Sequence, residues 1–86
     1  MKMVLTSEVE NVDKWLANRE ERHATISQFA ENIIEYASAD GSNVVALTLS
    51  ITDEQKMNEL MKDDNTRAEM IRHGVKPETN TSYVER

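Results

Sequence analysis

The segment that most constrains the fold is residues 44–51, because its apolar residues recur at every second position. Alternation of this kind over eight residues is the pattern of a half-buried β-strand. The residues on one side are large and apolar: Val45, Leu47, Leu49 and Ile51. The residues on the other side are smaller or hydroxyl-bearing: Val44, Ala46, Thr48 and Ser50. We predict that the first set faces a core beneath helices, and that the mixed face packs against another sheet or a second copy of the chain.

We predict that this strand is the second strand of a β-hairpin. Residues 40–43 read Asp-Gly-Ser-Asn and separate two apolar runs, which is typical of a tight turn between paired strands. Residues 31–39 are the predicted partner strand. Two further strands are expected near the ends of the chain, over residues 2–9 and, after Pro77, over residues 79–84.

Two helical regions lie between these strands. The first is expected over residues 13–29, where no Gly or Pro interrupts the chain and where Asn11 or Asp13 can cap the start. The second follows residue 51, with Thr52 as N-cap and Gln55 completing a capping box. It is expected to break at residues 63–66 and to end at Gly74.

The resulting order, β-α-β-β-α-β, predicts an α+β fold of the ferredoxin-like type in a single domain over residues 1–86. Its four-stranded antiparallel sheet carries both helical regions on one face and leaves the other face open. A chain of 86 residues buries a thin core. Covering the open face with a second copy, as a homodimer, is the simplest way to enlarge that core.

Composition excludes several functions. The chain has no cysteine, which rules out disulfides, thiolate metal sites and cysteine catalysis. It has 16 acidic and 10 basic residues, a net charge of −6, and no basic run longer than two residues, so we expect no nucleic-acid partner. No apolar run reaches the length of a signal peptide core or a membrane span, so we expect a cytoplasmic protein without a membrane partner.

Two stretches suggest a family. Residues 5–15, Leu-Thr-Ser-Glu-Val-Glu-Asn-Val-Asp-Lys-Trp, resemble the opening strand and helix of the antibiotic-biosynthesis-monooxygenase-like group of small dimeric α/β-barrel proteins. Residues 65–75, followed by Pro77 and Glu78, resemble the last helix, turn and strand of the same proteins. The resemblance implies a homodimer whose two sheets form a barrel, with a small-molecule pocket between sheet and helices in each subunit. The group includes cofactor-free oxygenases, haem-degrading enzymes and isomerases but shares no catalytic residue, so the resemblance assigns no site.

The candidate site comes from the first helical region. Arg19 and His23 share its apolar stripe with Val12, Leu16 and Ile26. A charged group on a core-facing stripe needs a partner, because desolvating it alone costs several kcal/mol. We expect that partner to be Glu35, Tyr36 or a bound anion in a polar cavity between helix and sheet. There His23 would act as the catalytic acid–base group, and Arg19 would hold a carboxylate, enolate or oxyanion.

Other interpretations of these residues stay open. Arg19 can extend to the solvent edge, and His23 can be an interior histidine whose hydrogen bonds are satisfied. Trp15 and Tyr36 would form a flat wall for an aromatic ligand, or Trp15 would simply pack in the core. We expect no cofactor and no metal, because the chain has only two histidines, and residues 63–65 are better explained as a capped helix break.

Two classes of function therefore remain. The first is a cofactor-free enzyme of the monooxygenase or isomerase type that acts on a small organic compound through His23 and Arg19. The second is a non-catalytic dimer that binds a small molecule or serves as an accessory or regulatory subunit. Low aromatic content, 5% of residues, slightly favours the second class, because pockets for aromatic substrates usually need more apolar wall.

Overall fold

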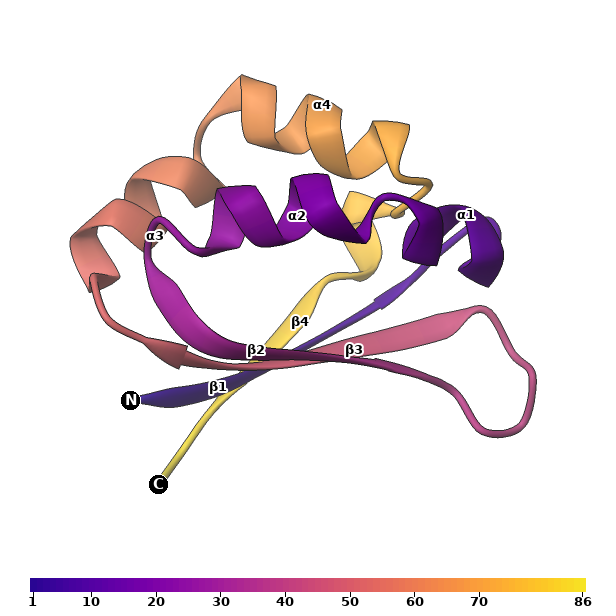
Figure 1. Ribbon diagram of the computed structural model, residues 1–86, viewed down its shortest axis with the longest axis horizontal. Coiled ribbons are helices and arrows are strands. Elements are labelled where there is room, and N and C mark those ends of the chain that lie inside the picture. Colours follow the sequence, from indigo (N-terminus) through magenta and orange to yellow (C-terminus); the bar gives the residue numbers. More distant parts are fainter.

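A computed structural model describes residues 1–86, and its four strands form one antiparallel sheet in the order β2-β3-β1-β4. All four α-helices lie on the same face of this sheet (Figure 1). The elements are β1 (Lys2–Glu8), α1 (Val12–Ala17), α2 (Arg19–Ile26), β2 (Ala30–Ala37), β3 (Val44–Ile51), α3 (Glu54–Met61), α4 (Asp64–Arg72), a 3-10 turn η1 (Pro77–Thr79) and β4 (Thr81–Val84). The predicted α+β class, the order of elements along the chain and the one-sided helical layer are confirmed.

Strand β3 alternates between the two faces as predicted. Val45, Leu47 and Leu49 are 2–8% exposed and belong to the core cluster beneath the helices, and Ile51 packs against that cluster. Leu5 of β1 and Glu35 of β2 pair with Leu47 in register, so all three side chains share the helix side of the sheet.

No helix covers the other face of the sheet (Figure 1), and this face carries exposed apolar side chains. We call this surface the open face. Val4, Ile34, Tyr36, Val44 and Tyr83 lie on it and are each at least 36% exposed. The register places them together, because Val4 pairs with Tyr83 and with Thr48, and Thr48 pairs with Ile34.

A bulge in β2 decides which of its residues face the helices. The register between β2 and β3 shifts between Glu31 and Ile34, and Asn32 adopts a left-handed conformation with φ 53°. Asparagine tolerates this conformation better than most residues, and an extra residue in one strand moves the following side chains to the opposite face. Ala30 and Ile33 can therefore both contact the core, and Glu35 faces the helices.

The first helical region differs from the prediction of one helix over residues 13–29. It forms two helices that meet at Asn18. The Asn18 side-chain amide donates to the Lys14 carbonyl at 2.8 Å, and its backbone N–H donates to the Trp15 carbonyl at 3.2 Å. Asparagine competes with helical backbone bonding in this way, which explains a break without Gly or Pro. Of the two suggested caps, Asn11 is the N-cap of α1, accepting from the Lys14 backbone N–H at 3.0 Å.

The second helical region breaks where predicted, but its N-cap was predicted one residue too early. Asp53, not Thr52, accepts from the Lys56 backbone N–H at 2.9 Å and begins α3. A carboxylate at this position also interacts favourably with the helix dipole. Asp63 then caps α4, accepting from the Asn65 backbone N–H at 2.7 Å.

The end of α4 fixes the position of His73. Gly74 follows it with φ 86° and donates its N–H to the Ile71 carbonyl at 2.9 Å. The Val75 N–H donates to the Met70 carbonyl at 2.9 Å, which completes a Schellman turn. The predicted role of Gly74 is confirmed, and the turn leaves His73 as the C-cap with only 1% of its surface exposed.

The most deeply buried side chains lie between the sheet and the helices. Val9, Trp15, Phe29 and His73 are each 1–2% exposed. None of the helices combines the length and the apolar character that crossing a membrane requires.

Candidate functional site

A cavity of about 220 Å³ lies between the sheet and the helices. Nineteen residues line it, and ten of them are hydrophobic. The lining comes from β1, β3 and β4 of the sheet, from all four α-helices, and from the segments that connect them. The polar lining residues include Arg22, Thr25, Glu69 and His73, which can donate or accept hydrogen bonds at the cavity. The helix side of the sheet is therefore not fully packed, and buried polar groups border the free space.

Arg22 is the central polar residue of this wall and is 6% exposed. Its Nη2 donates to the Trp15 carbonyl at 2.9 Å, and its guanidinium carbon lies 4.0 Å from the Trp15 ring centroid. Its Nε donates to Glu35, and its Nη1 lies 3.4 Å from Nδ1 of His73. A buried guanidinium is thus balanced by a carboxylate on one side and by an aromatic face on the other.

The buried carboxylate of Glu35 forms ion pairs with the basic side chains of α2. Its side chain is 1% exposed and accepts from Arg22 and, at 2.8 Å, from Nε of Arg19. Burial by itself would raise the pKa of Glu35. The hydrogen bonds from Arg22 and Arg19, together with the charges of Arg22 and His23, outweigh burial and hold this pKa below its ordinary value of 4.5.

His23 stands at the edge of this cluster. Its Nε2 lies 3.5 Å from Oε2 of Glu35 and has no partner within hydrogen-bond distance, although the atom is buried. The ring as a whole is about one third exposed. His23 therefore interacts with Glu35 through charge when it is protonated, and neither ring nitrogen is committed to a close hydrogen bond at this site.

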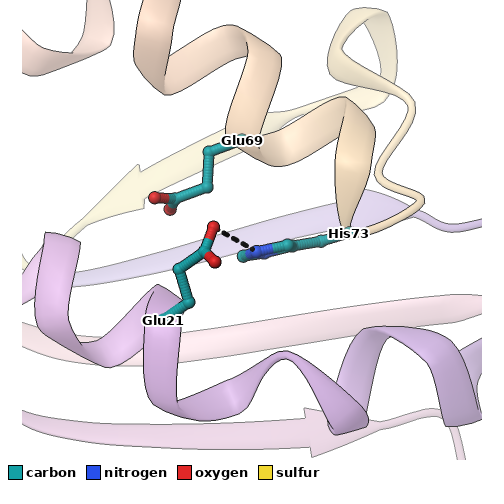
Figure 2. Close-up of side chains that lie close together, drawn as sticks. All are labelled: Glu21, Glu69 and His73. Carbon is teal, nitrogen blue, oxygen red and sulfur yellow. Dashed lines mark hydrogen bonds and ion pairs between the residues drawn. The ribbon is translucent and has the colours of Figure 1, made fainter.

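His73 sits on the opposite side of Arg22, between α2 and α4. Figure 2 shows its ring pointing toward Glu21, and the distance from Nε2 of His73 to Oε1 of Glu21 is 3.1 Å. Arg72 donates to the same oxygen of Glu21. Nearby, Glu69 accepts from the Thr25 hydroxyl at 2.7 Å. A polar chain therefore runs from Glu35 through Arg22 and His73 to Glu21.

Glu21, Glu69 and His73 place one ligand-type atom each within 4.8 Å of one another, which is close enough to surround a metal ion. The surroundings disfavour one. A metal on Nε2 of His73 would require the ring proton on Nδ1, where the Arg22 guanidinium presents an N–H donor instead of an acceptor. Arg72 also already neutralises the Glu21 carboxylate. The cluster is better explained as a hydrogen-bonded network.

The structure brings together three of the residues chosen from sequence and separates the others. Arg19, His23 and Glu35 form one ion-paired cluster, with the Arg19 side chain 55% exposed. They do not line the cavity, whereas Trp15 does. Tyr36 lies on the open face and is 48% exposed, because it follows Glu35 directly and strand residues alternate between faces. The expected wall shared by Trp15 and Tyr36 is therefore wrong.

Sequence reasoning missed Arg22 and His73. Arg22 lies seven residues after Trp15 and four before Ile26, so the helical stripe that drew attention to Arg19 and His23 includes it as well. The signal that could have separated them is the break at Asn18, which restarts the helix and turns Arg22 inward. His73 directly precedes the glycine that ends a helix, where a basic residue is favourable for its charge alone, so the sequence gives no sign that the side chain is buried.

Comparison with known proteins agrees on the fold. No family model and no curated protein matches the sequence. Among solved structures, SnoaB, a cofactor-independent oxygenase from Streptomyces nogalater, matches with a TM-score of 0.67 at 11% identity, over 99% of this chain and 91% of that one. A candidate antibiotic biosynthesis monooxygenase from Deinococcus radiodurans matches with a TM-score of 0.62 at 9% identity, over 100% and 93% of the two chains. A conserved protein from Methanosarcina mazei matches with a TM-score of 0.58 at 12% identity, over 99% and 91%.

These likenesses extend over the whole chain and concern the backbone. The predicted resemblance to the antibiotic-biosynthesis-monooxygenase-like proteins is confirmed as a shared fold. At about a tenth of residues identical, the match transfers no catalytic residue, so the site has to be argued from this chain's own side chains.

Proposed function

We propose that this protein is a homodimer that binds a small organic molecule in the cavity between its sheet and its helices. The observation that carries the proposal is the pair Arg22 and His73, two buried polar side chains that border an otherwise largely apolar cavity. Apolar walls with a few placed polar groups are the usual make-up of a small-molecule site.

The size of the cavity limits the ligand. Ligand pockets commonly measure roughly 300–1,000 Å³, and an apolar cavity of about 150 Å³ holds one benzene molecule. At about 220 Å³, this cavity suits a single-ring or short-chain compound. Dimer formation would change this size only where the partner reaches the mouth of the cavity.

The remaining donors of Arg22 indicate the ligand's polar group. A guanidinium has five N–H donors. Glu35, the Trp15 carbonyl and Nδ1 of His73 engage three of them. Two donors are left for a ligand, and a carbonyl, carboxylate or phenolate oxygen is the group they suit.

The residues chosen from sequence take supporting places in this proposal. Trp15 forms part of the apolar wall. Arg19, His23 and Glu35 hold Arg22 in position, since Glu35 bonds Arg22 directly and the two other side chains share that carboxylate. Tyr36, on the open face, is proposed as a contact between subunits and not as a ligand contact.

Homodimer formation is supported by the open face. Its exposed Val4, Ile34, Tyr36, Val44 and Tyr83 form an apolar surface on a small acidic chain, and such patches commonly mark interfaces. The family that the sequence resembles consists of homodimers, which supports the same arrangement for this chain. Two copies packed through this face would bury these side chains and leave the helices and the cavity on the outside of each subunit.

A cofactor-free enzyme of the monooxygenase or isomerase type is the second candidate function. The observation that favours it is the position of His73, an acid–base group beside the cavity with a carboxylate behind it. The alternative is a non-catalytic dimer that binds the same kind of molecule, or an accessory or regulatory subunit. Turnover of a bound compound that disappears in His73→Gln, with binding retained, would distinguish the enzyme from the binding protein.

The binding proposal can be tested with phenol, benzoate and benzene as probes, in a two-dimensional amide NMR titration. We expect millimolar probe to shift the resonances of residues around the cavity. Leu5→Phe adds a ring inside the cavity and should abolish these shifts. Ala24→Phe adds the same ring to an exposed position of α2 and is the matched control. Equal shifts in both variants, or no shift at the cavity with any of the probes, would contradict the proposal.

A further inference from the structure

The contacts of His73 determine which of its ring nitrogens carries the proton. Nδ1 lies 3.4 Å from Nη1 of Arg22, and a guanidinium can only donate. Nε2 lies 3.1 Å from Oε1 of Glu21, and an ionised carboxylate can only accept. The two contacts come from different residues and require the same neutral form, with the proton on Nε2 and a bare Nδ1.

We propose that Glu21 is a positioning residue that holds His73 in this form, so that Nδ1 is its proton-accepting atom at the cavity. This inference rests on the proposed function for its purpose, because it names the atom that would take a proton from a bound ligand. Its test is independent of the proposed function, because the protonation state of the His73 ring can be measured without any ligand.

Glu21 is itself held in place. Arg72 donates to the same carboxylate oxygen that faces His73, and this residue lies next to His73 in the chain. Figure 2 shows Glu21 reaching from α2 toward the ring at the end of α4. The Schellman turn fixes the backbone of His73, and Glu21 fixes the rotation of its ring about the side-chain bonds.

The contact at Nδ1 is the weaker of the two. At 3.4 Å, the Arg22 interaction is longer than the usual 2.7–3.2 Å of an N–H donor, so a better donor can replace it. A ligand hydroxyl of phenol or enol type would do so. Its O–H bond breaks, the proton moves to Nδ1, the imidazolium keeps its Nε2–H on Glu21, and the oxyanion remains beside the Arg22 guanidinium.

Glu69 limits which hydroxyl can enter. Glu69 lines the cavity, one of its carboxylate oxygens accepts from Thr25, and the carboxylate lies within 4.8 Å of a ring nitrogen of His73. A carboxylate there repels a ligand that arrives as a dianion and accepts from a second hydroxyl or an amine. The ligand class that fits is a ring compound with one acidic hydroxyl, a neighbouring hydrogen-bond donor and no more than one negative charge.

Nitrogen-15 NMR of histidine-labelled protein tests the inference, because protonated and bare ring nitrogens resonate far apart. At about pH 8 we expect a neutral His73 ring with a protonated Nε2 and a bare Nδ1, because Arg22 can only donate to Nδ1 and Glu21 can only accept from Nε2. A protonated Nδ1 in the neutral ring would overturn the assignment, whatever any ligand experiment finds.

Substitution of Glu21 tests the positioning role. In Glu21→Ala, exchange of the Nε2 proton with water should accelerate by roughly tenfold to a hundredfold, as expected for the loss of a hydrogen bond to a charged group. Glu21→Gln keeps an acceptor oxygen and should restore most of the protection. Glu20→Ala removes a neighbouring exposed glutamate of α2 and should change nothing. Equal exchange rates in wild type, Glu21→Ala and Glu20→Ala, with all three folded, would refute the role.

Discussion

Glu35→Leu is the substitution that tests the electrostatic core of the site most directly. The Glu35 side chain is 1% exposed, and that of its partner Arg22 is 8% exposed. Removing the carboxylate leaves the guanidinium buried without a counter-charge, and breaking a buried pair from one side costs about 3–5 kcal/mol. Arg19 is half exposed and can turn to water, so it adds little to this loss.

A loss of this size is a large share of the protein's free energy of unfolding. At roughly 0.05–0.15 kcal/mol per residue, an 86-residue domain has a free energy of unfolding of about 4–13 kcal/mol. We therefore expect Glu35→Leu to lower Tm by at least about 12 °C, since a domain of this size loses about 4–8 °C per kcal/mol. Thermal unfolding followed by circular dichroism at one fixed protein concentration is the assay, because the proposed dimer would make Tm depend on concentration.

A double-mutant cycle separates the buried charge from simple loss of packing. Replacing both partners, in Arg22→Met with Glu35→Leu, leaves no charge buried and should recover at least half of the stability lost in Glu35→Leu. Glu31→Leu, at an exposed position of the same strand, is the control and should change stability by less than about 0.5 kcal/mol. A loss below about 1 kcal/mol in Glu35→Leu, or losses that simply add in the double variant, would refute the reasoning.

The remaining predictions concern pH, the hairpin and the two faces of the sheet. Because the pKa of Glu35 is lowered on folding, its contribution is complete above about pH 5 and is lost as pH falls through that lowered pKa, so acid unfolding should show a smaller dependence on pH in Glu35→Leu. Hydrogen bonds from Ser38 and from the backbone of Ser42 lower the pKa of Asp40 to about 2, and Ser38→Ala should raise it toward 3.8 in a carboxyl NMR titration. Leu47→Ala should cost about 2–5 kcal/mol in chemical unfolding, and a cost well below 1 kcal/mol would contradict its place in the core. Ile34→Arg should convert the proposed dimer to a monomer in sedimentation, and an unchanged mass would contradict the open face as the interface.

The order of elements could be predicted from sequence because the strongest local signals agreed with the global packing. The alternation of residues 44–51, the Asp40-Gly41 turn and the glycine at 74 each specify a feature that the structure retains. The break at Asn18 could not be predicted with the same ease, because asparagine is tolerated inside helices and the residues on both sides of it have helical patterns.

The site was predicted only in part, because local sequence patterns do not show how a helix is rotated or which distant residues meet. Periodicity placed an inward-facing charge in the first helical region but assigned it to Arg19, whose side chain is 55% exposed, and Glu35 was one of three suggested partners for that charge. It could not choose Arg22 over Arg19, because both fall within one broad stripe and the choice depends on how α2 is rotated after the break. His73 lies 50 residues after His23 in the sequence, and only the folded chain places it beside Arg22.

The bulge at Asn32 has a consequence for how this protein can change over evolution. From the bulge onward, β2 assigns Ile33 and Glu35 to the helix side and Ile34 and Tyr36 to the open face. A substitution at any one of these positions alters a single face. The bulge places two residues of β2 opposite one residue of β3, so loss of one of them would keep the pairing of the residues that follow. Straightening the bulge without losing a residue would shift the register by one and exchange the faces, turning Glu35 outward and Ile34 and Tyr36 inward. The proposed binding site and the proposed subunit contact can therefore vary independently by substitution, but both depend on the bulge.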